Sequence, residues 1–519
     1  MRAFWSLIAL GLTLAVGCGG DPAGNTNGNG PNLGCADPNV LIPDCRRIDW
    51  RAGVPGGIPP VAQVCPAGAP SVLDFGAVGD GVVDDAEAFQ SAVDAADEGG
   101  AVWVPAGDYL LRSGVVIDHG VVLCGEGRDV SRLLIDADDT GIDIVVYDRG
   151  DWVAVASGLD KGATQLTVAA TQGAGFSPGD YAELQQSNDW SIMDPTGEWE
   201  HASWVPEAAV GQMVQITAVD GDVVTVDPPL LIDYDPGQDP QLRRVGLVSG
   251  AGLQSLYLTR LDPSDNHTVI MKNAVGCWMR DVESDTTCQA HVSMTSALWC
   301  EVRDSYLHDS HDHGGGGHGY GASLGSHVTA SLVENNVFVS LRHSMIIQVG
   351  ASGNVFGYNY SREPYQSEGG DWTPCDISLH GHYPSMNLFE GNTVQEIDVA
   401  DYWGPCGPGN TFFRNRVEAE GIDVLDHSHG QNIVGNELSD GDNVITVEET
   451  SLHTFVHGNY VEGAVSWDAS VNVQVLPASL YLAAPPPFLG AAPWPPLGAD
   501  LAPHDGVIPA EQRWRDGAP

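Results

Sequence analysis

SLVENN occupies residues 331–336, and its pattern of a short apolar strand followed by asparagine returns five more times along the chain. The later copies end as follows: NVFGYN at Asn359, NLFEGN at Asn392, NTFFRN at Asn415, QNIVGN at Asn436 and TFVHGN at Asn459. The first copy ends at Asn336, and successive copies lie 23, 33, 23, 21 and 23 residues apart. A unit of about 23 residues with short apolar strands and a polar turn residue is one coil of a β-solenoid.

Stacking of the coils brings the final asparagines into one column, because each coil advances by one strand spacing of about 4.8 Å. Asparagine side chains in such a stack can hydrogen-bond to one another. Asparagine also tolerates the left-handed backbone that a sharp turn requires. We therefore interpret this column as structural.

Residues 71–111 read SVLDFGAVGDGVVDDAEAFQSAVDAADEGGAVWVPAGDYLL. Asp84 and Glu87 have the spacing of a capping box, an apolar helical stripe follows, and Gly99 and Gly100 end it. Two short strands around a turn come next. The segment closely resembles the start of the pectate-lyase-like superfamily of right-handed parallel β-helix proteins, in which such a helix caps the open end. The resemblance implies the fold but no single reaction, because that superfamily includes lyases, hydrolases and phage tail proteins.

The predicted fold class is all-β: a right-handed parallel β-helix with an N-terminal capping helix and a small inserted β domain. We expect four folded parts in this order: a cap with the first coils at 71–153, an inserted β domain at 154–245, the main coils at 246–480 and a C-terminal cap or tail at 481–519. The insertion is predicted because GQMVQITAVDGDVVTVDPPL alternates apolar residues on both sides of Asp220 and Gly221, which is typical of a hairpin.

The N-terminus reads MRAFWSLIALGLTLAVGCGG, in which one arginine precedes an apolar run of signal-peptide length. It resembles a bacterial lipoprotein signal at residues 1–17, with Cys18 as the lipidated residue; an ordinary secretion signal is the alternative. Residues 18–70 are rich in Gly, Pro and Asn and are predicted to be a tether. We expect an exported protein, either an outer-membrane or cell-surface lipoprotein or a secreted one, whose membrane contact is the lipid anchor alone.

The chain carries 69 acidic residues against 21 basic ones, for a net charge of −48. Nucleic acid is excluded as a partner, because neutralising phosphates requires a basic surface. The acidity has two interpretations. It keeps an extracellular protein soluble, or its carboxylates collect divalent cations such as calcium (Ca2+). No cofactor is certain from the sequence.

Two coils are about ten residues longer than the others. One insertion contains HDSHDHGGGGHGYG at 308–321 and the other contains REPYQSEGGDWTPCD at 362–376, and both follow the same turn, two coils apart. The coil between them carries Arg342 and His343, so we predict a cleft at this coil. The residues predicted to contact a bound chain are His313, His318, Tyr320, Arg362, Trp372 and Trp403. An alternative makes His308, His311, His313 and His318 a transition-metal site.

Alignment of the strands that follow the turns puts three carboxylates in one column: Asp401, Asp426 and Glu449. Beside them come other polar side chains: His380, His382, Tyr383, Tyr402, His427 and His429. Carboxylates stacked one strand apart repel one another unless they share protons, bind a cation or meet cationic groups. The column is therefore a candidate metal or catalytic site, and a hydrogen-bonded polar ladder is the structural alternative.

These residues favour an enzyme acting on polysaccharide, most of all a lyase that cleaves a uronic-acid-containing glycan by β-elimination. That reaction needs a group to neutralise the sugar carboxylate, a base and an acid. Arg342, Arg362 or a bound cation is a candidate for the first role. The candidate bases are His343, His380 and His382, and the candidate acids are Tyr383 and Tyr402. Two alternatives remain: a glycoside hydrolase using Asp401, Asp426 and Glu449, and a non-catalytic glycan-binding surface protein.

Overall fold

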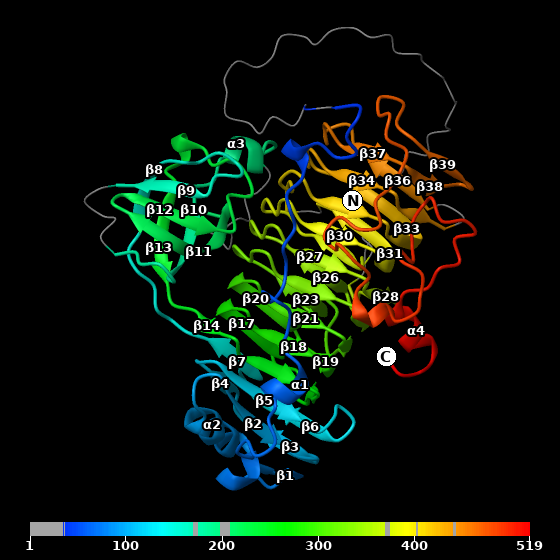
Figure 1. Cartoon of the computed structure of the whole chain (residues 1–519). Helices are drawn as coiled ribbons and strands as arrows, with labels where there is room; N and C mark the ends of the chain where they lie inside the picture. Colours follow the sequence, from blue (N-terminus) through cyan, green and yellow to red (C-terminus); the bar gives the residue numbers. More distant parts are fainter. Residues whose placement is uncertain are drawn as a thin grey trace. The chain divides into compact units, whose positions relative to one another are not determined.

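Parallel strands stack coil upon coil in this computed structural model (Figure 1). The structure describes residues 35, 37–169, 175–197, 208–368, 374–400, 403–439 and 443–519. Within these, one 11-stranded sheet comprises β2 (Gly100–Val104), β5 (Val121–Gly125), β15 (Gly252–Gln254), β18 (Trp278–Arg280), β21 (Glu301–Arg303), β24 (Leu332–Glu334), β27 (Val355–Gly357), β30 (Leu388–Glu390), β32 (Thr411–Phe413), β34 (Asn432–Val434) and β37 (Phe455–His457). We call it sheet A.

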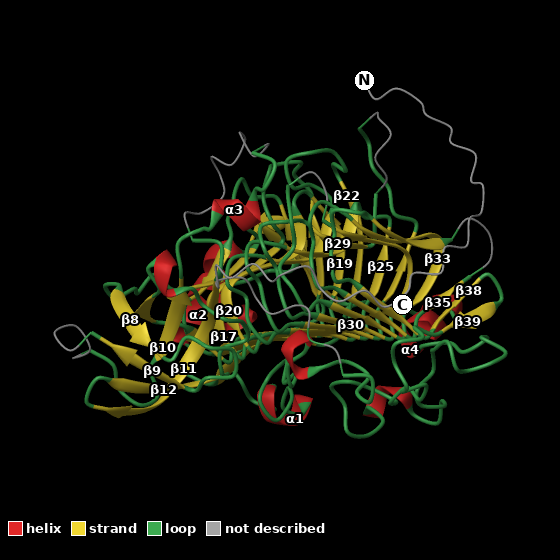
Figure 2. Ribbon diagram, turned by 90° about the horizontal axis from the view of Figure 1, so that it is seen from above, coloured by secondary structure: helices red, strands yellow, loops and turns green. Residues whose placement is uncertain are grey.

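A 22-stranded sheet, sheet B, forms the rest of the coil wall in the described residues. Its strands are β1 (Asp80–Asp84), β3 (Gly107–Leu111), β4 (Val115–Ile117), β6 (Ser131–Ile135), β7 (Ile142–Val145), β14 (Val248–Ser249), β16 (Tyr257–Arg260), β17 (Val269–Val275), β19 (Glu283–Thr287), β20 (Ala290–Leu298), β22 (Tyr306–Ser310), β23 (Tyr320–Leu324), β25 (Val337–Val339), β26 (His343–Ile347), β28 (Tyr360–Arg362), β29 (Ile377–Leu379), β31 (Thr393–Val399), β33 (Arg416–Val424), β35 (Glu437–Leu438), β36 (Val444–Val447), β38 (Asn459–Val461) and β39 (Ala464–Ser466). Figure 2 shows β19, β25 and β29 on one side of the coils and β30 on the other.

The space between the sheets is an apolar core that repeats with the coils. Phe356, Phe389 and Phe412 are fully buried there, and their rings stack with centroids 5.0 Å apart at each step. Phe356 on β27 pairs in register with Phe389 on β30, so the stack follows directly from the repeat. The predicted fold class, an all-β parallel β-helix, is confirmed.

Two asparagine ladders run through the turns of the coils. The predicted ladder is present: Asn359 Nδ2 donates to Asn392 Oδ1 at 3.0 Å, and every step from Asn336 to Asn459 repeats this bond at 2.9–3.0 Å. A second ladder joins Asn354 to Asn387 at 3.0 Å and Asn387 to Asn410 at 2.9 Å. The asparagines of the second ladder are the first residues of the copies NVFGYN, NLFEGN and NTFFRN, and the asparagines of the first ladder are their last residues. The second ladder could therefore also have been predicted from the repeat.

The cap begins with η2 (Val72–Phe75) and α2 (Ala86–Ala95). Phe89 and Val93 of α2 are fully buried against the first coils, as the predicted capping helix requires. The predicted capping box at Asp84 and Glu87 is wrong, because the N-cap of α2 is Asp85 and its side chain makes no cap bond. The box lies instead at η2, where Ser71 and Asp74 cap each other, because the same residue spacing recurs there.

The insertion predicted at 154–245 corresponds to a closed barrel. Its strands are β8 (Val153–Ser157), β9 (Gln165–Val168), β10 (Tyr181–Gln185), β11 (Gly211–Asp220), β12 (Val223–Asp227) and β13 (Gln241–Val245), accompanied by α3 (Trp190–Met193) and η4 (Pro236–Gln238). A buried contact joins it to the coils: His327 Nδ1 lies 2.7 Å from Glu183 Oε1, and Arg243 of the barrel forms an ion pair with the same carboxylate. Burial opposes the charge on Glu183, but His327 and Arg243 outweigh it and lower the pKa of that carboxyl to about 2.

The segment expected to be a tether packs instead along sheet A, from η1 (Asp44–Arg46) to α1 (Val61–Val64). Trp50 is buried and donates to Met386 O at 2.7 Å, and Cys65 forms a disulfide with Cys124 on β5. We call residues 41–65 the N-terminal strap; Figure 1 shows it in blue crossing sheet A. A Gly/Pro-rich sequence has no strand or helix period, so composition alone suggested a free tether where tertiary contacts hold the chain.

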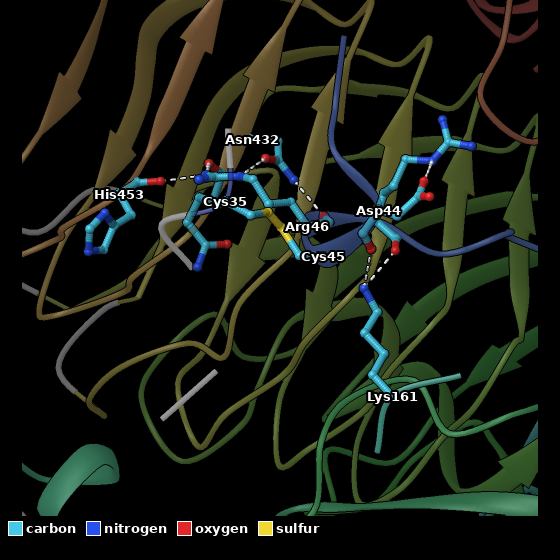
Figure 3. Close-up of a disulfide and its surroundings, with 9 residues drawn as sticks. Cys35, Asp44, Cys45, Arg46, Lys161, Asn432 and His453 are labelled. Carbon is cyan, nitrogen blue, oxygen red and sulfur yellow. Dashed lines mark hydrogen bonds and ion pairs between the residues drawn. A yellow bond between two sulfur atoms is a disulfide. The ribbon is translucent and has the colours of Figure 1, made fainter. Parts of the chain in front are cut away.

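One end of the strap is fixed beside the second disulfide, Cys35–Cys45 (Figure 3). Arg46 is buried and donates to Asn432 Oδ1 at 3.0 Å and also to the carbonyl oxygen of His453. Lys161, from the barrel, donates to Asp44 O at 2.7 Å. The strap therefore ties the last coils and the barrel to the same short segment. The predicted signal at 1–17 and Cys18 lie outside the described residues.

The C-terminal segment runs along the outside of the coils and includes η5 (Pro487–Leu489) and α4 (Pro509–Arg515). Ile508 and Ala510 pack against Val337 and Val339 of β25. Arg513 donates to Asn335 O at 2.6 Å. The predicted C-terminal cap thus covers the side of several coils as well as their end.

The C-terminal segment also buries Glu390 of β30, which leads to a pH-dependent prediction. Burial raises the pKa of this carboxyl from 4.5 to about 8, although Leu480 N donates to Oε2 at 2.8 Å. A folded-state pKa above the unfolded value means that stability is complete below about pH 4.5 and falls as the pH rises through about 8. We expect Glu390→Gln to raise the free energy of unfolding by about 2 kcal/mol at alkaline pH and to change little near pH 4.

Urea unfolding of both proteins at acidic and alkaline pH measures this difference. Glu462→Gln is the matched control, since Glu462 is an exposed glutamate near the end of the coils. An equal gain from Glu390→Gln at both pH values, or an equal gain from the control, would show that the buried charge is not the cause.

Candidate functional site

The two loop insertions meet over one coil of sheet B. Ser367 N, in the second insertion, donates to His313 O, in the first, at 3.2 Å, and the Tyr365 and His313 rings form an edge contact at 5.0 Å. His313 Nε2 also lies 2.8 Å from Ser340 O, on the coil between the insertions. The insertions therefore close over the coil that carries Arg342. Trp372 lies outside the described residues.

A column of polar side chains lies beneath these loops at the start of three neighbouring strands. Tyr320 on β23 pairs with His343 on β26, and their ring centroids are 5.3 Å apart. Met345 on β26 pairs with Ile377 on β29. His343 and Cys375 each lie two residues before these partners, so they are neighbours at the start of the two strands. His343 Nδ1 lies 3.2 Å from Cys375 O and 3.4 Å from Cys375 Sγ. Sequence reasoning missed Cys375; its signal is that it ends the second insertion.

Arg342 adds a cation to this column. Its Cζ atom lies 5.7 Å from the centre of the Tyr320 ring, and its Nη1 donates to Gly314 O of the first insertion at 2.6 Å. Only 8% of Arg342, 6% of Tyr320 and 3% of His343 is exposed. The loops thus shield a cation, an imidazole and a phenol from water, where electrostatic interactions are stronger than in solvent.

Of the predicted site residues that follow β29, His380 and His382 extend this column of polar side chains, and Tyr383 does not. The His380 ring lies 6.0 Å from that of His343 and 6.0 Å from that of Trp403. His382 stacks on Trp403 at 6.2 Å and is fully buried. Tyr383 has left-handed backbone geometry with φ of 67° and packs against the core of the barrel instead. Tyr383, a predicted acid, therefore lies outside this column, whereas Tyr320, predicted only as a substrate contact, is a tyrosine whose ring contacts His343.

The predicted carboxylate column belongs to later coils. β33 and β36 end in register at Val424 and Val447, so Asp426 and Glu449 occupy equivalent positions. The residue that contacts Asp426 is nevertheless Glu448: the backbone N–H of Asp426 donates to Glu448 Oε2 at 2.7 Å. The side chain of Glu449 is exposed. β33 lies three strands from β26, at least roughly 14 Å away. His427 contacts Asp426 at 3.4 Å, and Asp401 and Tyr402 lie outside the described residues.

The side chains of His318 and Arg362 contact residues outside the group around His343. His318 Nε2 lies 2.7 Å from Asp265 Oδ1, and this hydrogen bond lowers the pKa of the Asp265 carboxyl. Arg362 Nη1 contacts the Tyr360 hydroxyl at 3.1 Å and Glu418 Oε2 at 3.6 Å. The structure therefore brings together Tyr320, Arg342, His343, His380, His382 and Trp403, and leaves His318, Arg362, Tyr383, Asp426, His427 and Glu449 outside that group.

Known proteins resemble this chain in part of its sequence and in its fold. The family model "Rhamnogalacturonase A/epimerase, pectate lyase-like" matches residues 69–194. Mannuronan C5-epimerase AlgE5 of Azotobacter vinelandii is 42% identical over 85 residues, which are 14% of this chain and 8% of that protein. Alginate lyase 7 of the same organism is 32% identical over 113 residues, 20% of this chain and 13% of that protein. The matches thus span a small part of either relative.

Among solved structures, the tailspike gp61 of Pseudomonas phage phi297 shares the architecture. It superposes with a TM-score of 0.53 at 15% identity, covering 75% of this chain and 69% of the tailspike. This likeness supports the β-helix alone. The resemblance predicted from residues 71–111 is supported by the family model over the cap and the start of the barrel insertion.

Proposed function

We propose that this protein is an exported lyase that cleaves a uronic-acid-containing polysaccharide by β-elimination. The observation that carries the proposal is the group formed by Tyr320, Arg342 and His343, since it supplies a phenol, a cation and an imidazole within ring-contact distance of one another. A uronic acid carries a carboxylate next to the carbon that loses its proton. The three groups match the three requirements of the reaction.

Arg342 is assigned the role of binding and neutralising the sugar carboxylate. Its guanidinium already donates to a carbonyl oxygen, Gly314 O, so a carboxylate in that place would gain a charge-assisted bond. Removal of the neighbouring proton then leaves negative charge on the carboxylate oxygens, close to the cation. Because the Gly314 carbonyl occupies this position, the first insertion has to move for a sugar to bind there.

His343 is assigned as the base. Its Nδ1 lies 3.2 Å from the Cys375 carbonyl oxygen. Because a carbonyl can only accept a hydrogen bond, Nδ1 carries the hydrogen and donates, and the basic lone pair is on Nε2. Tyr320 is assigned as the acid that protonates the leaving glycosidic oxygen, because its ring lies beside the imidazole. The carbonyl of Cys375 thereby sets the tautomer that the reaction needs.

The names of two similar proteins support this choice of chemistry. One is a mannuronan C5-epimerase and the other an alginate lyase. Inversion at C5 of a uronate and elimination both start with loss of the C5 proton. Epimerisation is therefore the second candidate function, and it differs from elimination in returning a proton instead of expelling the leaving group.

Digestion of alginate, mannuronan and polygalacturonate in heavy water tests the proposal. We expect ultraviolet absorbance from an unsaturated uronate at the new chain end, with at least one of these polymers. Deuterium incorporation at C5 without that absorbance would indicate an epimerase. New reducing ends without unsaturation would indicate a hydrolase, and binding without turnover would indicate a glycan-binding protein; both results contradict the proposal.

Export through the predicted signal, with Cys18 as the lipid-bearing residue, is part of the same proposal, because a polymeric substrate of this kind lies outside the cell. It is supported by the apolar run at residues 1–17 and by disulfides Cys35–Cys45 and Cys65–Cys124, which persist in oxidising compartments.

A further inference from the structure

A second cluster of polar side chains lies on the outer face of sheet B, where β19 and β22 run side by side. Asp285 on β19 pairs in register with His308 on β22, and Asp309 follows His308 in the chain. His308 opens the histidine-rich stretch at 308–321. The function proposed above uses none of these three residues, so their convergence calls for its own explanation.

The three side chains present one ligand atom each to a common point. His308 Nδ1 lies 2.9 Å from Asp309 Oδ2 and 3.6 Å from Asp285 Oδ1. One ligand atom from each of the three residues lies within 4.8 Å of the other two. Two ligands bound to zinc at about 2.0–2.2 Å in tetrahedral geometry are roughly 3.3 Å apart. The separations around His308 bracket that value, so small side-chain rotations suffice to place an ion between them.

The imidazole is held so that Nδ1 faces the two carboxylates. Glu283 Oε1 lies 3.4 Å from Nε2 on the opposite edge of the ring, and the ring stacks on Tyr306 at 4.0 Å with 15° between the planes. A carboxylate on the far nitrogen is the usual support of a metal-bound histidine, because it fixes the tautomer and increases the basicity of the ligating nitrogen. The His308 side chain is only 12% exposed.

Asp285 is oriented in the same way. The Tyr257 hydroxyl donates to its Oδ2 at 2.6 Å, and its Oδ1, which accepts from the Thr286 hydroxyl at 2.7 Å, lies 3.6 Å from His308 Nδ1. Both inner ligands thus have an outer partner that fixes their orientation, from strands β16 and β19. Asp309 is more exposed, at 56% of its side chain, and completes the set from the open side.

We propose that Asp285, His308 and Asp309 bind a divalent transition metal of the Zn²⁺ type. One imidazole nitrogen with two carboxylate oxygens suits such an ion better than calcium, which prefers six to eight oxygen ligands. Three protein ligands leave a fourth position for water or a substrate oxygen. The site is distinct from the Arg342 and His343 group and carries a different chemistry.

Calorimetric titration of the full-length protein with ZnCl₂ tests the proposal, after chelator treatment and in an excess of Ca2+ that occupies ordinary acidic surface sites. We expect one saturable Zn²⁺ site, lost in His308→Ala and weakened by roughly tenfold or more in Asp309→Asn. Asp312→Asn is the matched control, because Asp312 lies in the same loop, is 53% exposed and would lose the same charge. The control is expected to bind Zn²⁺ as the unmodified protein does.

Three results would overturn the site: no Zn²⁺ binding in excess Ca2+, equal weakening by Asp309→Asn and Asp312→Asn, or unchanged binding by His308→Ala. The second would mean that the acidic surface attracts the ion without a defined set of ligands. Since Asp309→Asn changes an exposed side chain, it keeps the test valid even if His308→Ala folds poorly. None of these results depends on lyase activity.

Discussion

Alanine at His343 is expected to lower the rate of unsaturated product formation by about 10²–10⁴-fold, the range for loss of a general base. The His343 ring lies between the phenol of Tyr320 and the ring of His380. Its Nδ1 lies beside Cys375 O, which leaves Nε2 as the basic nitrogen. The alanine variant lacks the imidazole that contacts the Tyr320 ring. The rate on saturating uronate polymer, followed by ultraviolet absorbance, measures the effect.

His343 is nearly buried, so its removal can also disturb packing. Urea unfolding of the variant separates the two effects: we expect its midpoint to stay close to that of the unmodified protein while the rate falls. His453→Ala is the control, because His453 is an exposed histidine on a later coil. If the rate and the unfolding midpoint fall together, or if the rate changes no more than in the control, His343 supports the fold and is not the base.

The repeat made the fold predictable, since each copy of the asparagine pattern contains its own strand and turn. The N-terminal strap was not predictable in the same way. Trp50 is held by a bond to Met386, which lies 336 residues away, and no local pattern around Trp50 indicates such a contact. Periodicity reports which face of a strand is buried, but it says nothing about an irregular segment that lies across many coils.

The candidate site was predictable in part for the same reason. Arg342 and His343 stand out because they lie on the coil between the two long insertions. Tyr383 was misplaced because the backbone turns at that residue, and the turn directs its ring to the barrel. A spacing of 23 residues joins Asp285 to His308, one full repeat, so the second cluster was visible in the repeat but not in any short stretch of sequence.

The asparagine ladder gives the largest expected effect on stability. Asn359 is fully buried, and its Nδ2 donates to Val333 O at 2.9 Å and to Asn392 Oδ1 at 3.0 Å. Its Oδ1 accepts from the backbone and side-chain N–H groups of Asn336, each at 3.0 Å. Alanine would leave buried polar groups without partners on both neighbouring coils. We expect Asn359→Ala to lower the free energy of unfolding by about 3–5 kcal/mol.

Urea unfolding measures this loss, and Asn266→Ala is the matched control. Asn266 is half-buried, and its amide makes one long hydrogen bond, to Ser264 at 3.4 Å, so its loss should cost less than about 1 kcal/mol. The double variant Asn359→Ala/Asn392→Ala tests whether the column acts as a unit. Its cost should be less than the sum of the single costs, because the two residues share hydrogen bonds that can be lost only once. Strict additivity, or an Asn359→Ala loss no larger than that of the control, would mean that the apolar core alone holds the coils in register.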